Sequence, residues 1–559
     1  MADMTTALKA LVAQALKNIA EEKGVDPAKI GEIHFERPKQ ENHGDWATNA
    51  AMQNCKALGC KPRDLAQLIA DSLSADRHIR RIEVAGPGFI NFYMSNLWMA
   101  DVVRDVLTQR ENYGRVDQGK GRKAQIEFVS ANPTGPLHIG HGRGAAVGDV
   151  TGNILAFAGW DVEKEYYVND AGLQMNILGR STQARYFELL GHPEKFPLPE
   201  DSYKGHYIYD IAQEVIDKHG DEFLSRPVEE SLPFFKNYAS TRILGQIQDE
   251  LKDFGVTFDR FFSEKTLYDR GLVPAAIQTL KERGHLYEQD NALWFRTTEY
   301  GDDKDRVLMR SNGVPTYFTS DIAYHKEKFD RGFDRVIDVW GADHHGYVPR
   351  MKAAVEALGY DPSKFSILLI QFVNLLRDGE QVKMSTRSGQ FIPLQDVIDE
   401  VGVDATRYYF LMRRSDSHLD FDLELAKSQS ADNPVYYVQY AHARLCSILQ
   451  KAAEKGVALP SLEAFDAEQI STPEEKRLFT KLASFSDEVD RAAAELEPHR
   501  IVNYVYELAG DFHSYYNSGS RILEENGQQQ STHLLMVEAV RTVLANALRL
   551  LGITAPKKM

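Results

Sequence analysis

The chain has 559 residues, of which 43% are hydrophobic and 26% charged, and its formal net charge is −16. This composition predicts three or four folded domains and excludes a disordered chain. The sequence has no apolar run long enough to cross a membrane, and it has only three scattered cysteines, Cys55, Cys60 and Cys446. We therefore expect a cytoplasmic protein with no membrane span, no disulfide framework and no zinc site.

The charge balance bears on nucleic-acid binding. An excess of acidic residues, 81 against 65 basic ones, argues against such binding when taken alone. Net charge governs long-range steering, however, whereas a binding face needs only local positive charge. A solvated surface is the simpler interpretation of each candidate cluster. The clusters are Arg77, His78, Arg80 and Arg81; Lys326, Lys328, Arg331 and Arg335; and Arg413 with Arg414.

Residues 1–112 are predicted to form an α+β domain. Apolar side chains from Leu8 to Ile19, and again from Leu65 to Leu73, follow helical spacing. The segment 86–93, Gly-Pro-Gly-Phe-Ile-Asn-Phe-Tyr, predicts a turn followed by a strand. The glycines and charges of residues 112–123 suit a linker to the next domain.

Residues 113–403 are predicted to form an α/β domain with a Rossmann-like parallel sheet. Strand, loop of small residues, helix and strand follow one another here, which is the order of a βαβ unit. The segment of about 175–285 has mainly helical patterns, so we expect it to be a helical insertion. The expected elements are strands at 124–129, 161–168, 336–340 and 365–371, a loop at 130–136 and a helix at 140–158.

Residues 404–559 are predicted to form an all-α helical bundle. Their apolar residues follow helical spacing, and no strong strand pattern interrupts them. The expected helices lie near 404–413, 434–454, 474–496, 501–523 and 531–551.

The first motif with chemical content lies between the strand at 124–129 and the helix at 140–158. The start of a helix favours an anion, because its first N–H groups are unpaired. Gly140 lets a base or phosphate come close, and His138 and His141 lie three apart, on one face of the first helical turn. Two donors on that face can hold a phosphate in a transition state. The motif comprises Ala131, Asn132, Pro133, Thr134, Gly135, Pro136, Leu137, His138, Ile139, Gly140 and His141.

A second motif, Lys383-Met-Ser-Thr-Arg387, is followed by Ser388 and Gly389. Two cations, three hydroxyls and a glycine within seven residues suit a loop that folds over a polyphosphate. Alone, each motif has a simpler interpretation. The first would be a capped helix with two surface histidines, and the second an exposed basic turn. Their order in the chain, before a helical bundle, makes the pair more specific than either alone.

Together the two motifs resemble the HIGH and KMSKS signatures of the class I aminoacyl-tRNA synthetases, although other adenylyl-transferring enzymes share the first. Longer segments are similar to arginyl-tRNA synthetases of bacterial type, and the resemblance covers essentially the whole chain. These segments are 43–49 in the N-terminal domain, 127–141 around the first motif, 314–325, 340–346, 433–444 at the start of the bundle, and the C-terminal 547–556.

The resemblance implies an arginine pocket beside an ATP site. A guanidinium is planar and carries five donors, so its selection over lysine calls for acceptors in fork geometry. The family's motif positions place Tyr317 and Asp321 as side-chain readers, four apart on one helix face. The further expected arginine contacts are Glu127, Ser130, Asn132, Asp343 and His344. Because neighbours on a strand point to opposite faces, we do not expect His344 and His345 to bind a metal together.

The expected catalytic residues are His138, Gly140 and His141 around the nucleotide, and Lys383, Ser385 and Arg387 over the β- and γ-phosphates. One departure from the family pattern concerns the second lysine of KMSKS, which is Thr386 here. Some arginyl enzymes compensate with a lysine before HIGH, but the corresponding residue is Gly135. We therefore expect Lys383 and Arg387, or cations elsewhere, to provide the positive charge.

The implied reaction joins L-arginine to tRNA(Arg) by way of arginyl-adenylate, with ATP as a substrate and Mg²⁺ accompanying it. The resemblance also implies a monomer. Two alternatives remain open: a class I synthetase for another amino acid, and a catalytically weak tRNA-binding paralogue. An alternative interpretation of the bundle tyrosines Tyr436 and Tyr440 is that they are core residues at helical spacing. The expected tRNA contacts are Asn91 and Phe92 in the N-terminal domain, and Tyr436, Gln439, Tyr440 and Arg444 in the bundle.

Overall fold

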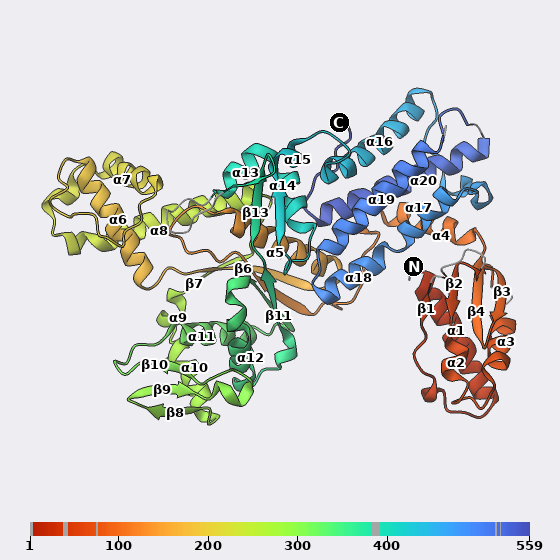
Figure 1. Ribbon diagram of the computed structural model, residues 1–559, viewed down its shortest axis with the longest axis horizontal. Coiled ribbons are helices and arrows are strands. Elements are labelled where there is room, and N and C mark those ends of the chain that lie inside the picture. The colour runs from red at the N-terminus through yellow and green to blue at the C-terminus, as the bar shows by residue number, and fades with distance from the viewer. Residues whose placement is uncertain are drawn as a thin grey trace.

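The protein is described from a computed structural model that covers residues 4–36, 38, 43–73, 76–382, 392–519, 522–525 and 527–559. The KMSTR motif, with Lys383, Ser385 and Arg387, lies outside these described residues. Figure 1 shows a parallel sheet near the middle, the long helices of a bundle on one side, an inserted helical unit on the other, and the N-terminal domain beside the bundle. No helix within the described ranges is long and apolar enough to cross a membrane.

The N-terminal domain is α+β, as predicted. Its antiparallel sheet has the strand order β1-β2-β4-β3, and both predicted amphipathic helices are present. Leu8, Val12 and Leu16 pack with Leu65 and Ile69 in its core. The elements are α1 (Met4–Glu22), β1 (Phe35–Glu36), β2 (Trp46–Thr48), α2 (Ala50–Asn54), α3 (Pro62–Leu73), β3 (Ile79–Ala85), β4 (Phe89–Met94) and α4 (Leu97–Gln109), which leads to the next domain.

The central domain contains a five-stranded parallel sheet of order β12-β11-β5-β6-β7. All four predicted strands and the predicted helix are found within two residues of their expected ends. The helix after β5 lies close on the sheet, because Gly148 has no side chain and a Cβ there would be 2.2 Å from the Phe128 ring. The elements are β5 (Lys123–Glu127), α5 (Ile139–Phe157), β6 (Asp161–Val168), β7 (Arg260–Ser263), α11 (Tyr317–Asp330), β11 (Arg335–Gly341), α12 (Val348–Ala357) and β12 (Phe365–Ile370).

Only part of the segment 175–285 is the predicted helical insertion. Three helices project from the sheet around an aromatic core of their own (Figure 1), but β7 within this range is the fifth strand of the parallel sheet. A small antiparallel sheet, β10-β9-β8, follows it and was not predicted. The elements are α6 (Leu173–Leu189), α7 (His206–His219), α8 (Val228–Asp253), α9 (Lys265–Asp269), α10 (Leu272–Glu282), β8 (Leu286–Gln289), β9 (Ala292–Phe295) and β10 (Arg306–Met309).

The C-terminal part is helical, with two differences from the prediction. The strand β15, within residues expected to be helical, pairs in parallel with β13. The single helix expected at 474–496 is two, which meet at Ser484, where the hydroxyl donates to the carbonyl of Lys481. The elements are β13 (Val373–Arg377), β14 (Glu380–Gln381), α13 (Leu394–Val401), α14 (Val403–Leu411), β15 (Leu419–Asp422), α15 (Leu423–Lys427), α16 (Pro434–Glu454), α17 (Pro473–Ala483), α18 (Phe485–Glu495), α19 (His499–Asn517) and α20 (Gly527–Leu550).

Candidate active site

Two cavities open at the carboxyl ends of β5 and β11, where parallel sheets bind ligands. The acidic cavity, of about 420 Å³, is lined by Glu127, Ser130, Asn169, Tyr317, Asp321, Asp338, His344 and Tyr347 among others. The histidine cavity, of about 670 Å³, is lined by Asn132, His138, Gly140, His141, Asp343, His344 and Phe372 among others. Val129, Ser130 and the end of β11 line both. Tyr317 and Asp321, predicted to read the guanidinium, and His138, Gly140 and His141, predicted to surround the nucleotide, therefore lie on either side of one shared wall.

The chain leaves β5 through a turn that directs the wall residues into both cavities. Val129 and Ser130 have φ angles of +66° and +41°, a conformation unusual for a β-branched residue such as valine. The turn lets the Ser130 hydroxyl donate to Glu127 Oε1 at 2.7 Å and accept from the backbone N–H of Tyr167 at 3.1 Å. Glu127 is therefore held by its own turn and by the neighbouring strand.

His138 and His141 stack with ring centroids 3.6 Å apart and form a capping box at the start of α5. The Gly140 N–H donates to His138 Nδ1 at 3.1 Å, and the His138 N–H donates to His141 Nδ1 at 3.2 Å. Burial lowers the pKa of His138, and burial with the nearby His138 lowers that of His141 to about 3. Both rings are therefore neutral at pH 7, with the proton on Nε2.

Asp321 lies one helical turn after Tyr317 in α11, and both side chains line the acidic cavity. The Tyr347 hydroxyl donates to Asp321 Oδ2 at 2.5 Å. Burial raises the pKa of Asp321 above its usual value, in spite of this bond. Tyr317 is 65% exposed, so Asp321 forms the interior of the cavity and Tyr317 its mouth.

The remaining predicted pocket residues are less enclosed. Asn132 donates to Gln174 at 2.7 Å, and it lines the histidine cavity rather than the acidic one. Asp343 and His344 belong to a 3₁₀ turn after β11, and the side chains of both are more than 60% exposed. The expected strand geometry at His344 and His345 was therefore wrong. Throughout the described part of the chain, no three His, Cys, Asp or Glu side chains gather as metal ligands.

Several polar residues that shape the acidic cavity were missed or misinterpreted from the sequence. Lys328 was counted with a candidate basic surface, but its side chain is completely buried against Glu127 and Asp338. Arg331 of the same cluster pairs with Glu163 and Glu165. One residue in the sequence could have indicated that Lys328 is buried. Asp338 is a carboxylate within the apolar predicted strand 336–340, and a buried carboxylate requires a polar or charged partner.

The predicted tRNA contacts differ in how accessible they are. Phe92 has no exposed surface and packs in the core of the N-terminal domain, and Asn91 is 6% exposed. Their burial contradicts a direct contact with tRNA in this conformation. Gln439 donates to Asp404 at 2.8 Å and to the carbonyl of Thr554 at 3.1 Å, so it joins α16 to α14 and the C-terminal segment.

The other bundle residues form a stacked row along α16. The rings of Tyr436 and Tyr440 are parallel, with centroids 5.8 Å apart. The Arg444 guanidinium lies 4.6 Å from the Tyr440 ring and 4.5 Å from that of Tyr516 in α19. Tyr516 is 37% exposed. This row of rings around an arginine provides the type of surface on which unpaired bases stack.

Three protein-family models match the chain, each over a different segment. The arginyl tRNA synthetase N-terminal domain matches residues 6–94, the catalytic domain of class I (R) tRNA synthetases matches 102–422, and the DALR anticodon-binding domain matches 438–559. The three models follow the order of the α+β domain, the parallel sheet and the helical bundle seen in the structure.

Relatives match over their whole length. The arginine–tRNA ligases of Syntrophotalea carbinolica and of a Geobacter species are 53% and 51% identical, each over all of this chain and all of the relative. A solved structure of a Campylobacter jejuni protein, described as a putative arginyl-tRNA synthetase, superposes with a TM-score of 0.76 at 37% identity, over 83% of this chain and all of that one. The Thermus thermophilus arginyl-tRNA synthetase shares the fold over both chains, with a TM-score of 0.75 at 24% identity. The chain belongs to the arginyl-tRNA synthetase family of class I aminoacyl-tRNA synthetases.

Proposed function

We propose that this chain carries out the arginine–tRNA ligase reaction of its family with arginine in the acidic cavity and ATP in the histidine cavity. The observation that carries the proposal is the wall shared by the two cavities, built from Val129, Ser130 and the end of β11. An amino acid in one cavity and a nucleotide in the other meet there. Positioning of this kind supplies much of the catalysis when no covalent enzyme intermediate is needed.

The reaction has two steps. A carboxylate oxygen of arginine attacks the α-phosphorus of ATP, the bond to the bridging oxygen breaks, and pyrophosphate leaves with that oxygen. The 2′-hydroxyl of the terminal adenosine of tRNA(Arg) then attacks the carbonyl carbon of arginyl-adenylate, loses its proton, and releases AMP. ATP enters with Mg²⁺, held mainly by phosphate oxygens and water.

The two histidines act as neutral hydrogen-bond donors. Since Nδ1 of each ring accepts a backbone N–H, Nε2 carries the proton that can be donated to a phosphate oxygen. Donors fixed in advance stabilise the charge that develops on the α-phosphate. A Cβ on Gly140 would lie 3.1 Å from the His138 ring, so glycine also preserves the position of His138.

Arginine is selected by charge and by planar geometry. Asp321 offers a buried carboxylate, Glu127 offers a second acceptor from β5, and Tyr317 covers the mouth of the cavity. Asn132, Ser130 and His344 lie toward the histidine cavity, where the α-amino and carboxylate ends of the substrate would be, and Asp343 lines that cavity too. These acceptors favour a cation, which argues against a class I enzyme for an acidic amino acid.

Lys383, Ser385 and Arg387 would close over the β- and γ-phosphates. The support comes from the residues that flank them: the backbone N–H of Leu394 donates to the carbonyl of Leu137 at 2.9 Å, and that of Ile139 to Ile392 at 3.3 Å. The segment that follows this motif is therefore tied to the HIGH region. Near wild-type activation by both Lys383→Ala and Arg387→Ala would contradict this role.

The tRNA would bind the bundle through Tyr436, Tyr440 and Arg444, with Tyr516 added from the structure. Because Phe92 and Asn91 are buried, we do not retain them as direct contacts. The three cysteines are free thiols, which suits a reducing cytoplasm. We also propose that the protein is a monomer, which sedimentation velocity would test.

Pyrophosphate exchange with each of the twenty amino acids, with and without tRNA, tests the proposed function. We expect exchange to depend on arginine. Asp321→Asn is expected to raise the KM for arginine by at least about tenfold, since it removes an ionic contact to the guanidinium, and to leave the KM for ATP within about twofold. Exchange with another amino acid, or an unchanged KM for arginine, would contradict the assignment of the acidic cavity. An inactive protein that still binds tRNA would support the paralogue alternative.

A further inference from the structure

Three carboxylates stand side by side across the central sheet. Asp338 of β11 is in register with Glu127 of β5, and Glu127 is in register with Glu165 of β6. All three are at most 9% exposed. Adjacent like charges on one sheet face repel, and the buried face of a parallel sheet is normally apolar. This carboxylate row, Asp338-Glu127-Glu165, therefore needs a compensating group in the layer above it.

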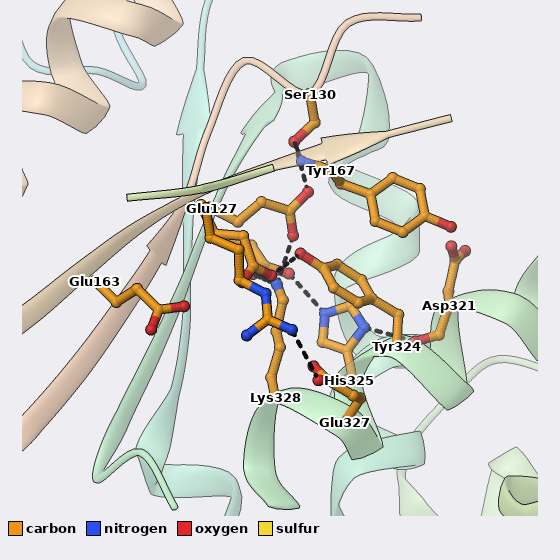
Figure 2. A network of polar contacts seen from close by, with 12 residues as sticks. Glu127, Ser130, Glu163, Tyr167, Asp321, Tyr324, His325, Glu327 and Lys328 are labelled. Carbon is orange, nitrogen blue, oxygen red and sulfur yellow. Dashed lines mark hydrogen bonds and ion pairs between the residues drawn. The ribbon is translucent and has the colours of Figure 1, made fainter. Parts of the chain in front are cut away.

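The helix α11 provides that compensation from one side. Lys328 Nζ lies 2.5 Å from Glu127 Oε2 and 2.6 Å from Asp338 Oδ1, with no exposed surface of its own. His325 Nε2 lies 2.7 Å from Asp338 Oδ2. Arg331, at the end of the helix, binds Glu165. His325, Lys328 and Arg331 thus follow the carboxylate row one by one, and Figure 2 shows the side chains of Lys328 and His325 extending from α11 toward the sheet.

Lys328 lies behind the wall of the acidic cavity and contacts two residues of that wall, Glu127 and Asp338. Glu127, Asp338 and His325 all line that cavity. One carboxylate oxygen of Glu127 accepts a hydrogen bond from the Ser130 hydroxyl and the other from the Lys328 ammonium, so the orientation of the carboxylate is fixed from both sides. Its position depends on the lysine, because Ser130 alone would leave the second oxygen free to turn toward Asp338 or away from it.

Asp321, one helical turn before His325 in α11, differs from the carboxylate row. Within the described ranges, no lysine, arginine or histidine side chain lies within ion-pair distance of its carboxylate; its partner is the hydroxyl of Tyr347. The cavity therefore holds two carboxylates that share the ammonium of Lys328, Glu127 and Asp338, and a third, Asp321, for which no cationic partner is seen among these residues. A substrate with a single positive charge completes this arrangement.

We propose that Lys328 is a positioning residue for arginine selection, which holds Glu127 in place and leaves Asp321 as the carboxylate that the substrate's charge must satisfy. The inference rests on the proposed assignment of arginine to the acidic cavity. Lys328 itself touches neither substrate in this scheme. It acts through Glu127, and by docking α11 on the sheet it also sets the direction of Asp321 and Tyr317.

The test is Lys328→Met, which keeps the length of the side chain and removes its charge. We expect the KM for arginine to rise about tenfold or more, because Glu127 and Asp338 then face each other without a cation, while the KM for ATP changes less than about twofold. The matched control is Lys326→Met on the same helix, whose ammonium pairs with Asp330, away from the carboxylate row. It should leave both constants unchanged.

The double variant Lys328→Met with Asp338→Asn distinguishes positioning from a general loss of structure. It removes the cation and one carboxylate together, so it should lower the KM for arginine below that of Lys328→Met and recover thermal stability. If Lys328→Met does not fold, the KM for arginine is measured in the double variant instead. A KM for arginine equal to that of the wild type in Lys328→Met, or in the double variant where the single variant does not fold, would overturn the inference.

Asp321→Asn, measured in parallel, separates the two proposals. If Asp321→Asn raises the KM for arginine and the Lys328 variants do not, only the role of Lys328 fails. If Asp321→Asn has no effect, the cavity assignment itself fails. A loss of kcat with an unchanged KM for arginine in Lys328→Met would also contradict positioning, since it would indicate an effect on the chemical step.

Discussion

Asp149 of α5 and Arg407 of α14 form a buried ion pair, with Oδ2 2.5 Å from Nη2 and both side chains at most 4% exposed. The same guanidinium donates to the carbonyls of Leu551, after α20, and Phe254, after α8. Lys164 approaches Asp149 from β6 at 2.6 Å. One arginine therefore joins the helix of the HIGH region to the inserted helices and to the last helix of the bundle.

Asp149→Ala is expected to destabilise the protein by about 3–5 kcal/mol, because it leaves the buried Arg407 guanidinium without its carboxylate and takes one partner from the half-buried Lys164. The effect is measured as a lower midpoint of thermal unfolding. Asp161→Ala, at an exposed position at the start of β6, is the control and should change the midpoint little. An unchanged midpoint in Asp149→Ala would show that Arg407 and Lys164 are satisfied by other groups.

The stability of the protein is expected to fall below pH 6.5 through the stacked histidines. The folded state holds the pKa of His141 at about 3, below the ordinary value of 6.5. Between these values the unfolded chain binds more protons than the folded one, so stability decreases as the pH falls, by up to about 1.4 kcal/mol per pH unit for this group. Thermal unfolding between pH 7 and 5 should therefore show a smaller loss in His141→Asn than in the wild type. Equal losses would contradict a neutral His141.

Arginine binding is expected to depend on pH near neutrality through Glu264. Burial, and then Asp321 and Asp170, raise the pKa of Glu264 to about 7. This group is ionised above that pH, and a bound cation favours the ionised form. The KM for arginine should therefore fall as the pH rises from 6 to 8, and Glu264→Gln should remove most of this change. The KM for ATP is the internal reference, and a parallel change in both constants would indicate another titrating group.

The ionisation of Glu264 affects the stability of the fold in the opposite direction: a higher pH favours arginine binding but lowers the stability that this group contributes. Its folded pKa is raised above the ordinary value of 4.5, so the folded state binds the extra proton between these values. Stability from this group is full below about pH 4.5 and is lost as the pH rises toward 7. Glu264→Gln is therefore expected to raise the unfolding midpoint more at pH 8 than at pH 5.

Arg444→Ala is expected to weaken tRNA use without affecting adenylate formation. The guanidinium lies within 4.6 Å of the Tyr440 ring and 4.5 Å of the Tyr516 ring, so it links the two rings into one surface. Stacking of a base on an aromatic ring contributes about 1–3 kcal/mol, so kcat/KM for tRNA should fall about tenfold. Aminoacylation kinetics with varied tRNA measure this. Lys451→Ala, exposed on the same helix, is the control, and equal losses in the two variants would contradict a specific stacking surface.

The sequence predicted the architecture where the patterns were long. The helix at 434–454 and the strand at 161–168 were expected with the ends that the structure shows, and in the structure the Asn433 side chain caps the start of this helix. Short elements were missed. β7 and β15 have four residues each, too few for a periodicity, and their pairing partners are distant in the chain.

The site divides in the same way. The first motif was sufficient to name His138 and His141, and the resemblance to the family was sufficient to name Tyr317 and Asp321, because each pair lies within one short segment of the chain. Glu127 was named from the resemblance as well, but its contact with Lys328, and that of Lys328 with Asp338, were decided only by the tertiary structure. A lysine in a polar helix looks the same in sequence whether water or two carboxylates surround it, and the carboxylates come from strands that meet only when the sheet forms.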